Sequence, residues 1–320
     1  MSHWTVNDIP DMHNKIVLVT GANRGLGLEM TRALVTHGAH VIMAVRNLNQ
    51  GHMAEATIKQ TVPDASLEVM ALDLSSLASV RAFAARFVQT HDHLDVLLNN
   101  AAITAIPQRQ ETMDGFEMQF GTNHLGHFAL TGLLIPTLVI TPGSRVVTMT
   151  SNGRRTARQL DFDDLQSHHS YSRWGAYGKS KRANLLFAFE LQTRFTATGV
   201  STISIAAHPG GANTSVPGTD NHLSPLEHFF FGLVSQSAAM GALPMLYTAT
   251  APHVTGGELV GPAHFAHSRG YPEVDRHASR EYDRADAARL WKMSEELTGV
   301  TYDALHQHSE PQRPGVLFER

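Results

Sequence analysis

The stretch KIVLVTGANRGLGLEMTRALVTHG, residues 15–38, decides how this chain folds. Its first seven residues are a short β-branched run that ends in glycine, and the residues from 26 onward repeat apolar side chains with a helical period. Gly21, Gly25 and Gly27 lie between the two segments. Glycines at such a junction allow a tight turn and let the backbone approach a pyrophosphate, which the N–H groups of the helix N-terminus would bind. The stretch therefore predicts a strand and a helix that bind a dinucleotide.

The same alternation of strand and helix continues along the chain. Further strand-like runs are AHVIMAV (39–45), SLEVMALDL (66–74), LDVLLNNA (94–101), SRVVTMTS (144–151) and VSTISIAAHPG (200–210). Several of these runs are almost continuously apolar, as expected of parallel strands covered on both faces. The order predicts one α/β domain over residues 1–320, a single Rossmann-type, doubly wound parallel sheet of seven strands with helices on both faces. Its core is predicted over residues 14–300, and the polar tail 303–320 is expected to be partly loose.

Composition narrows the class of protein. The 320 residues are 42% hydrophobic and 17% charged, with a formal net charge of −4. A weakly acidic chain gives no electrostatic reason to expect nucleic acid as a partner. The chain has no cysteine, which excludes disulfides and thiolate chemistry. It shows no signal-peptide pattern and no apolar run of the ~20 residues that cross a bilayer, so we expect a cytoplasmic protein without a transmembrane segment.

Twenty histidines, some of them in pairs, raise the question of a metal site. The pairs are His91 with His93, His124 with His127, and His168 with His169. The sequence shows no cysteines and no converging carboxylates beside them. We therefore interpret them as loop and surface histidines and expect no bound metal.

The residues after the second predicted strand indicate which dinucleotide binds. An NAD site carries Asp or Glu about 20 residues after the glycines, but Val45 occupies that position here and Arg46 follows it. Arg24, within the glycine loop, is a second cation on the same side. Arginine can bind a 2′-phosphate bidentately, so the pattern favours NADP(H). Asp73, after the third strand, either accepts from the adenine amino group or caps the helix that starts near Ser75.

The stretch AYGKSKRANLLFAFE, residues 176–190, places Tyr177 and Lys181 one helical turn apart. Both side chains are therefore expected on one face of a helix, although such a pair also occurs on many helix surfaces. A phenol has a pKa near ~10. An ammonium at ~4 Å, in an effective dielectric of ~20, supplies about the 4 kcal/mol that would bring this pKa to neutrality. The spacing thus predicts an acid–base tyrosine whose pKa the lysine lowers.

Taken together, these motifs resemble the short-chain dehydrogenase/reductase family over about residues 14–300. The resemblance rests on TGANRGLG (20–27), NNAA (99–102), Ser151 after the fifth strand, the pair Tyr177 and Lys181, and HPG (208–210). The segments that look most like the retinol dehydrogenase and protochlorophyllide reductase branch are TNHLGHFALT (122–131), YGKSKRANLLFAFEL (177–191), GELVGP (257–262) and LWKMSEELTG (290–299). Two residues depart from the family pattern, since Ala102 stands where glycine is usual and Thr150 where serine is common.

The resemblance implies a role for each site residue. Tyr177 would exchange the proton of the reacting oxygen, Ser151 would hydrogen-bond the same oxygen, and Lys181 would also bind the nicotinamide ribose. Asn123 would hold a water in a proton relay behind Lys181, with a helix cap as the alternative. The residues expected to bind the cofactor are Gly21, Asn23, Arg24, Gly25, Leu26, Gly27, Arg46, Asp73, Leu74, Asn100, Ala101, Ala102, Tyr177, Lys181, Pro209, Gly210 and Thr214.

Two segments are expected near the substrate. Residues 152–173 are longer than in the shorter family members and predict a loop or an extra hairpin. Residues 215–236, with Phe229, Phe230 and Phe231 in succession, predict a lid over a lipophilic substrate. A membrane-surface or subunit contact and an ordinary buried helix are the alternatives for the phenylalanines.

The predicted function is hydride transfer between NADP(H) and a carbonyl compound or an alcohol, as in a carbonyl reductase acting on a lipophilic small molecule. Reduction of a conjugated C=C bond, as in the protochlorophyllide reductase branch, uses the same tyrosine and lysine and stays open. A non-catalytic NADP(H)-binding sensor or scaffold is the third interpretation, although such proteins usually lose the tyrosine or the lysine. The resemblance also makes a homodimer or homotetramer possible.

Overall fold

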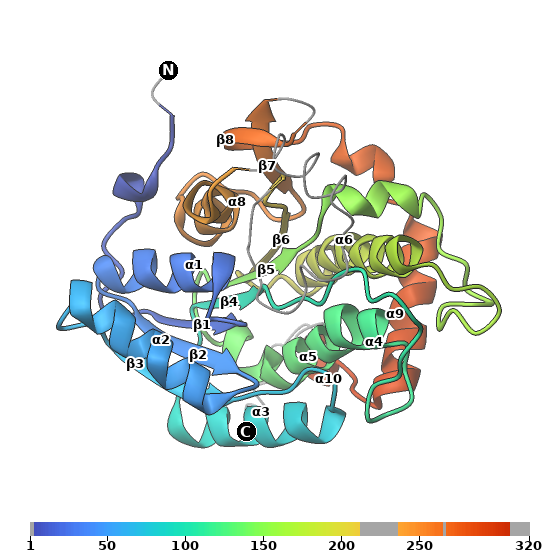
Figure 1. Ribbon diagram of the computed structural model, residues 1–320, viewed down its shortest axis with the longest axis horizontal. Coiled ribbons are helices and arrows are strands. Elements are labelled where there is room, and N and C mark those ends of the chain that lie inside the picture. The colour runs from blue at the N-terminus through green and yellow to red at the C-terminus, as the bar shows by residue number, and fades with distance from the viewer. Residues whose placement is uncertain (1–2, 212–235, 265–266, 308–320) are drawn as a thin grey trace, which may run out of the picture.

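A computed structural model describes residues 3–211, 236–264 and 267–307 of the chain (Figure 1). Its strands are β1 (Ile16–Thr20), β2 (His40–Val45), β3 (Leu67–Ala71), β4 (Val96–Asn99), β5 (Arg145–Met149), β6 (Ile203–Ala207), β7 (Leu259–His264) and β8 (Arg269–Val274). All of them belong to one sheet, in the spatial order β3-β2-β1-β4-β5-β6-β7-β8. Neighbouring strands run parallel except β7 and β8, which are antiparallel.

Helices cover both faces of this sheet (Figure 1). On one face the apolar core includes side chains of α1 (Gly25–Thr36), α2 (Leu48–Thr61) and α8 (Ala238–Thr250). The other face is covered by α3 (Leu77–Thr90), α5 (Gly126–Val139) and α6 (Arg173–Thr198), on which α9 (Arg284–Thr298) and α10 (Asp303–Gln307) pack. Shorter helices are η1 (Val6–Asp8), α4 (Met118–Phe120), η2 (Gly121–Leu125), η3 (Asn152–Thr156) and η5 (Ala278–Glu281). The predicted doubly wound α/β sheet is confirmed.

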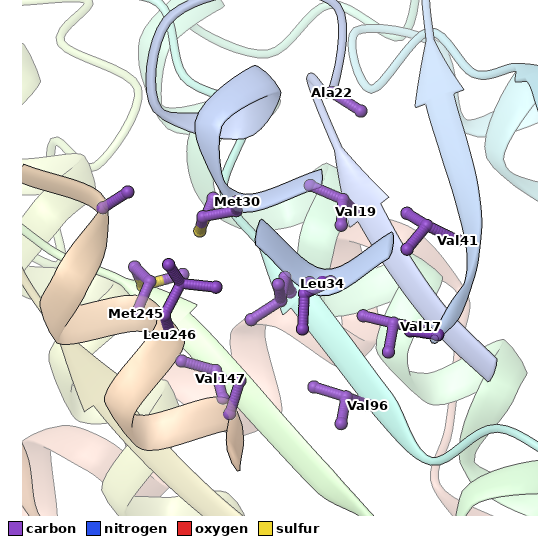
Figure 2. Packing of buried hydrophobic residues seen from close by; sticks show 14 of the residues in the cluster. Val17, Val19, Ala22, Met30, Leu34, Val41, Val96, Val147, Met245 and Leu246 are labelled. Carbon is purple, nitrogen blue, oxygen red and sulfur yellow. The ribbon is translucent and has the colours of Figure 1, made fainter. Parts of the chain in front are cut away.

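The alternation of side chains along β1 gives the sheet two apolar faces. Val17 and Val19 belong to the core under α1 and α8, whereas Leu18, between them, belongs to the core under α3 and α5. Figure 2 shows the two valines near Met30 and Leu34 of α1, and these four side chains are fully buried, as is Leu18. Because a strand buried on both faces needs apolar side chains on both of them, IVLV (16–19) is a continuous apolar run.

An aromatic cluster holds the C-terminal helices to the second face. The ring centroid of Trp291 in α9 lies 5.1 Å from that of Phe128 in α5 and 4.5 Å from that of Tyr302. The Tyr302 hydroxyl donates to the Phe128 carbonyl over 2.7 Å, and Leu305 of α10 is buried. Residues 303–307 thus pack as a helix, residues 308–320 lie outside the described residues, and the expectation of a partly loose tail stays a prediction.

The structure corrects the predicted number of strands, and for residues 152–173 it agrees with the loop rather than the hairpin. The sheet has eight strands rather than seven. The sequence does not predict β8, RGYPEV, because this strand is only partly buried and lacks an apolar run. Residues 152–173, all of which are described, contain η3 and turns up to the start of α6, and they form no hairpin. The predicted lid at 215–236 lies outside the described residues except for Gln236. Among the helices that the structure describes, none combines the length and apolar character needed to cross a bilayer.

We expect Trp291→Ala to lower the free energy of unfolding by about 3–5 kcal/mol, because it leaves a cavity where the rings of α5 and the C-terminal segment meet. Equilibrium denaturation by urea measures this change. Ile140→Ala, at a side chain that is 64% exposed, is the control and should change stability by less than about 0.5 kcal/mol. Equal effects of the two substitutions would contradict the role given to the aromatic cluster.

Candidate active site

The parallel order of the sheet brings the predicted site residues to one edge. β1, β4, β5 and β6 are successive neighbours that run in the same direction. The loops that follow them carry the glycine loop, NNAA, Ser151 and HPG. Between β1 and β4 the strand order reverses, since β2 lies on one side of this pair and β5 on the other. Ligands of open α/β sheets bind at such a switch point.

The glycine loop has the backbone that the sequence predicts. Gly21 and Gly25 have φ angles of +68° and +53°, in the left-handed region that glycine adopts without strain. A Cβ atom on Gly27 would lie 2.2 Å from the carbonyl oxygen of Gly21. Any side chain at position 27 would therefore force the loop away from the helix, so the turn itself requires glycine.

The first turn of α1 offers N–H groups to an anion. Arg24 precedes the helix, and no side chain in the described residues caps it. By contrast α2, α3, α6, α8 and α9 each begin with an Asn, Ser or Asp whose side chain accepts from the first turn. Uncapped N–H groups and the helix dipole attract negative charge. The backbone of Gly25, Leu26 and Gly27 thus fits the pyrophosphate of a dinucleotide.

Both predicted phosphate-binding arginines are accessible. Arg24 and Arg46 are exposed, and neither forms an ion pair within the part of the chain that the structure describes. Val45, at the position of the usual acid, is a buried residue that ends β2. Asn23 Nδ2 donates to Gln50 Oε1 over 3.2 Å, which ties the glycine loop to α2.

The structure decides against one of the two alternatives for Asp73. Helix α3 begins at Leu77, and the side chain of Ser76 caps it. Asp73 Oδ1 instead accepts from the N–H and the hydroxyl of Ser75, over 2.9 and 2.6 Å, and so forms the turn after β3. The next residue, Leu74, is buried. Contacts of these two residues with a cofactor stay predictions.

The NNAA loop is fixed to the end of β1. Thr20 Oγ1 accepts from the backbone N–H groups of Asn100 and Ala101, each over 2.9 Å. Asn100 Nδ2 donates back to the Thr20 carbonyl over 2.7 Å. Ala102 is exposed and lacks the positive φ that would require glycine. This backbone therefore accepts alanine in place of the usual glycine.

Ser151 and Tyr177 meet although they come from different elements. Their side chains lie close together, since a Cβ atom on Gly153 would lie 3.5 Å from Ser151 Oγ and 2.9 Å from Tyr177 Cε1. Ser151 Oγ also accepts from the backbone N–H of Gly153 over 3.1 Å. The fold therefore brings these two residues together, and their joint binding of a reacting oxygen stays a prediction.

Lys181 does not tune Tyr177 as the sequence predicts. Its Nζ lies 5.9 Å from the centroid of the Tyr177 ring and donates to the Met149 carbonyl over 3.2 Å. Burial lowers the pKa of Lys181 to about 7. Although part of Tyr177 remains accessible, burial raises its pKa, and hydrogen bonds to Ser151 and Thr104 only oppose that rise. The prediction of an acidic phenol is therefore wrong for the chain by itself, because desolvation is the largest influence on this pKa.

Asn123 lies inside a helical segment rather than at its end. It belongs to η2, a π-helical turn that joins α4 to α5 without a break, so the helix-cap alternative is wrong. Its Oδ1 accepts from the N–H of Ile103 and its Nδ2 donates to the Ile103 carbonyl, both over 2.9 Å. Nδ2 also donates over 3.0 Å to Ser180 Oγ, which in turn donates to the Tyr177 carbonyl. Asn123 thus connects the loop after β4 to the start of α6, and its proton relay stays a prediction.

The HPG loop packs against the segment between β7 and β8. Gly210 has a φ of +68°, and a Cβ there would lie 2.4 Å from the Ser268 carbonyl oxygen. Gln236 Nε2 donates to the Pro209 carbonyl over 3.1 Å, and its Oε1 accepts from the N–H of Gly270 over 3.1 Å. No sequence pattern singles out this glutamine, because its partners lie in distant segments. Thr214 lies outside the described residues.

The histidine pairs differ in their burial. His124 and His127 are buried, contrary to their interpretation as surface residues. The apolar helical pattern around them was the signal that would have predicted this. His127 Nδ1 lies 3.0 Å from the Asn123 carbonyl and its Nε2 lies 2.9 Å from Thr20 Oγ1, so it links η2 to the end of β1. Burial lowers the pKa of His127 to about 4.

One group of described residues brings potential metal-ligand atoms within 4.8 Å of one another, namely His40, Glu68 and His91. It lies at the amino ends of β2 and β3 and at the end of α3, and therefore at the edge of the sheet opposite the candidate site. The expectation of no bound metal stays a prediction.

Comparison with known proteins agrees with this geometry. Residues 15–222 match the family model of short chain dehydrogenases. Retinol dehydrogenase 14 of Mus musculus is 38% identical over 303 residues, which cover 90% of this chain and 87% of that protein. Polyprenol dehydrogenase of Danio rerio is 37% identical over 300 residues, which cover 92% and 89%. A crystal structure of an uncharacterised protein from Mycobacterium paratuberculosis is 39% identical, with a TM-score of 0.77 over 94% of this chain and 99% of the other.

The chain belongs to the short-chain dehydrogenase family. It is therefore an oxidoreductase, in a family that uses a nicotinamide cofactor. Its similarity to several retinol dehydrogenases places it in the retinol dehydrogenase-like branch, which confirms the resemblance seen in the sequence.

The buried lysine predicts a pH-dependent stability. A lysine in an unfolded chain has a pKa near ~10.4, whereas burial lowers that of Lys181 to about 7. Between these two values the unfolded chain binds one proton more than the folded chain, so stability rises with pH across this window, and the full cost of burying the charge is present below it. We expect Lys181→Met to raise the free energy of unfolding of the cofactor-free protein at pH 7 by about 2–4 kcal/mol. Between about pH 7 and pH 10, the slope of this free energy against pH should fall by the contribution of one proton.

Chemical denaturation from pH 6 to pH 10 measures both effects. Lys59→Met, at a half-exposed lysine paired with Glu55 on α2, is the matched control and should keep the wild-type pH dependence. A Lys181→Met variant that is less stable than wild type at pH 7, with the same slope, would show that the ammonium is not buried at a cost.

Proposed function

We propose that this protein transfers hydride between NADP(H) and a carbonyl compound or a primary or secondary alcohol, with Tyr177 as the acid–base residue. The observation that carries the proposal is the close approach of the side chains of Ser151 and Tyr177, which both lie against Gly153, beside the buried Lys181. Two hydroxyl groups converge there at the carboxyl edge of the sheet, where one substrate oxygen could accept from both.

In the direction of reduction, Tyr177 donates its proton to the carbonyl oxygen. Because burial raises its pKa, the phenol is protonated at neutral pH and available as an acid. Ser151 donates a hydrogen bond to the same oxygen and holds it in place. Lys181 lies beside the Tyr177 ring, and its pKa of about 7 lets it hold or release a proton near neutrality. When bound, the nicotinamide supplies or accepts the hydride.

Asn123 supports this site from behind. Its side chain fixes Ile103 and Ser180, and Ser180 donates to the backbone of Tyr177. In the proposed mechanism Asn123 also holds the water through which Lys181 exchanges its proton with solvent.

The substrate that we propose is lipophilic. Relatives that align over nine-tenths of this chain are named for retinol and polyprenol, and both of these compounds are apolar alcohols. These names favour C–OH and C=O chemistry over reduction of a conjugated C=C bond. The presence of the serine, tyrosine and lysine together disfavours a non-catalytic sensor or scaffold.

The preference for NADP(H) rests on charge. The exposed side chains of Arg24 and Arg46 carry no carboxylate partner within the described ranges, and Val45 leaves no acid to repel a 2′-phosphate. Arginine binds phosphate in a bidentate, charge-assisted manner. The residues at the ends of β1 and β2 therefore fit NADP(H) better than NAD(H).

The proposal also includes a cytoplasmic location.

A homodimer or homotetramer is compatible with the proposal. α9 and α10 pack on α5 and α6 (Figure 1). The surfaces of α5 and α6 that they cover are therefore closed to a second copy, and any subunit contact would use other surfaces.

Arg46→Ala should raise the KM for NADPH by about 10–100-fold, because a charge-assisted hydrogen bond to phosphate contributes about 1.5–3 kcal/mol. The KM for NADH should change by less than about threefold. Initial rates followed by nicotinamide absorbance measure both constants, and Lys59→Ala on the exposed face of α2 is the control. Equal kinetic efficiency of the wild type with NADPH and NADH would contradict the proposed preference.

Tyr177→Phe should lower turnover by about 10²–10⁴-fold, because it removes the acid–base group, and NADPH should still bind. A panel of aldehydes, ketones and secondary alcohols, followed by NADPH absorbance, measures turnover, and NADPH fluorescence measures binding. Tyr171→Phe is the matched control, since the Tyr171 hydroxyl donates to the Ile106 carbonyl and not to the site. Near-normal activity of Tyr177→Phe would refute the assignment.

A further inference from the structure

Arg154, three residues after Ser151, is the largest fully buried side chain in the described part of the chain. It lies in η3, the 3-10 helix that begins three residues after the end of β5. A guanidinium is always charged, and burying a charge is costly unless it is paired and hydrogen-bonded. Its partners therefore show what holds η3 in place.

One side of the guanidinium binds a carboxylate that is distant in the sequence. Arg154 Nε donates to Glu281 Oε2 over 2.8 Å, and Nη2 donates to Glu281 Oε1 over 3.1 Å. This bidentate pair fixes both the distance and the plane of the guanidinium. The carboxylate of Asp275, also buried, lies 3.8 Å from Nη2. Both acids follow β8, so the C-terminal part of the sheet supplies the counter-charges.

The other side of the guanidinium binds the residue that carries the candidate catalytic hydroxyl. Arg154 Nη1 donates to the Ser151 carbonyl over 3.2 Å and to Asn152 Oδ1 over 3.3 Å. The backbone N–H of Arg154 donates to the same Ser151 carbonyl over 3.0 Å. Two donors from one residue thus hold the peptide group of Ser151, and rotation of this peptide would move the serine hydroxyl.

The same turn also packs against Tyr177. A Cβ atom on Gly153 would lie 2.9 Å from Tyr177 Cε1, and a Cβ on Gly178 would lie 2.7 Å from the Gly153 carbonyl oxygen. The two glycines let η3 approach α6 this closely. A shift of η3 would therefore disturb both hydroxyl groups of the site.

Two neighbouring arginines share the acids but not the serine. Arg155 lies 3.6 Å from Glu281 and 3.8 Å from Asp275, and its side chain is 45% exposed. Arg182, next to Lys181, lies 3.6 Å from Glu281. Arg155 is thus a matched comparison, because it is also an arginine of η3 and lies near the same two acids. Among the contacts of the described residues, it forms no bond to the Ser151 carbonyl.

We propose that Arg154 is a positioning residue for catalysis, which uses Glu281 as its anchor to hold Ser151 at the distance from Tyr177 that the reaction requires. The inference rests on the proposed function of these two hydroxyl groups. Stability alone does not explain the pair, because replacing a buried ion pair by apolar residues often leaves a protein equally or more stable. A rigid anchor for a catalytic hydroxyl does explain it, because small displacements of reacting groups lower rates steeply.

The test compares Arg154→Lys with Arg155→Lys in the full-length protein. Lysine keeps the charge but loses the bidentate fork and the bond to the Ser151 carbonyl. The substrate is the carbonyl compound of the panel that the wild type reduces fastest. Enzyme in excess over NADPH is mixed with saturating carbonyl, and the first-order rate constant of NADPH absorbance loss is recorded. As long as folded enzyme remains in excess over NADPH and above the Kd for NADPH, this rate constant does not depend on the fraction of folded enzyme, because all of the NADPH is bound.

We expect Arg154→Lys to lower this rate constant by about 10–100-fold, with the Kd for NADPH from fluorescence within about twofold of wild type. Arg155→Lys should stay within about twofold of wild type in both. Glu281→Gln removes the anchor and leaves Arg154 in place, and it should also lower the rate constant. The double variant Arg154→Lys, Glu281→Gln should have a rate constant no lower than that of the slower single variant.

A folded Arg154→Lys variant with the rate constant of Arg155→Lys would overturn the inference. If Arg154→Lys does not fold, Glu281→Gln decides, and a rate constant within about twofold of wild type would overturn it equally. A wild type that oxidises NADPH with no compound of the panel would instead overturn the proposed function, whereas an active wild type with an unaffected Arg154→Lys refutes the positioning role alone.

Discussion

The contact between α6 and the carboxyl end of β5 is the constraint on which the site depends. The Met149 carbonyl accepts from Lys181 Nζ and from Asn184 Nδ2, and Thr150 Oγ1 donates to the Lys181 carbonyl over 2.7 Å. These bonds join the last residues of the strand to the helix that carries the tyrosine and the lysine. Because Ser151 directly follows the strand, the same contact sets the distance between its hydroxyl and that of Tyr177.

The cofactor side of the site depends on a second constraint, the close approach of α1 to β1. Gly27 packs against the Gly21 carbonyl, and Thr20 binds the backbone of the NNAA loop. His127 joins Thr20 to the Asn123 carbonyl, so the end of β1 is connected to the segment that supports Tyr177. The dinucleotide loop and the acid–base residues are thus parts of one hydrogen-bonded framework rather than separate motifs.

Electrostatics in this framework are governed by burial. Desolvation lowers the pKa of Lys181 and raises that of Tyr177, so both residues favour their uncharged forms in the chain by itself. Burying these two ionisable groups lowers the free energy of unfolding. Such shifted pKa values are common where ionisable groups are enclosed for catalysis. Arg154 remains buried as a cation beside Glu281 because two carboxylates face it.

The sequence by itself determined the strand–helix alternation, the glycine loop and the spacing of Tyr177 and Lys181, because periodicity and glycine positions record local backbone geometry and burial. It could not predict β8, because this edge strand lacks an apolar run. It also could not predict that Asn123 lies inside a continuous helical segment. Only the tertiary structure decided the direction of the two pKa shifts and the pairing of Arg154 with Glu281. Desolvation and ion pairing depend on atoms from separate segments of the chain, such as Arg154 and Glu281, which are 127 residues apart, and no local pattern encodes which segments meet.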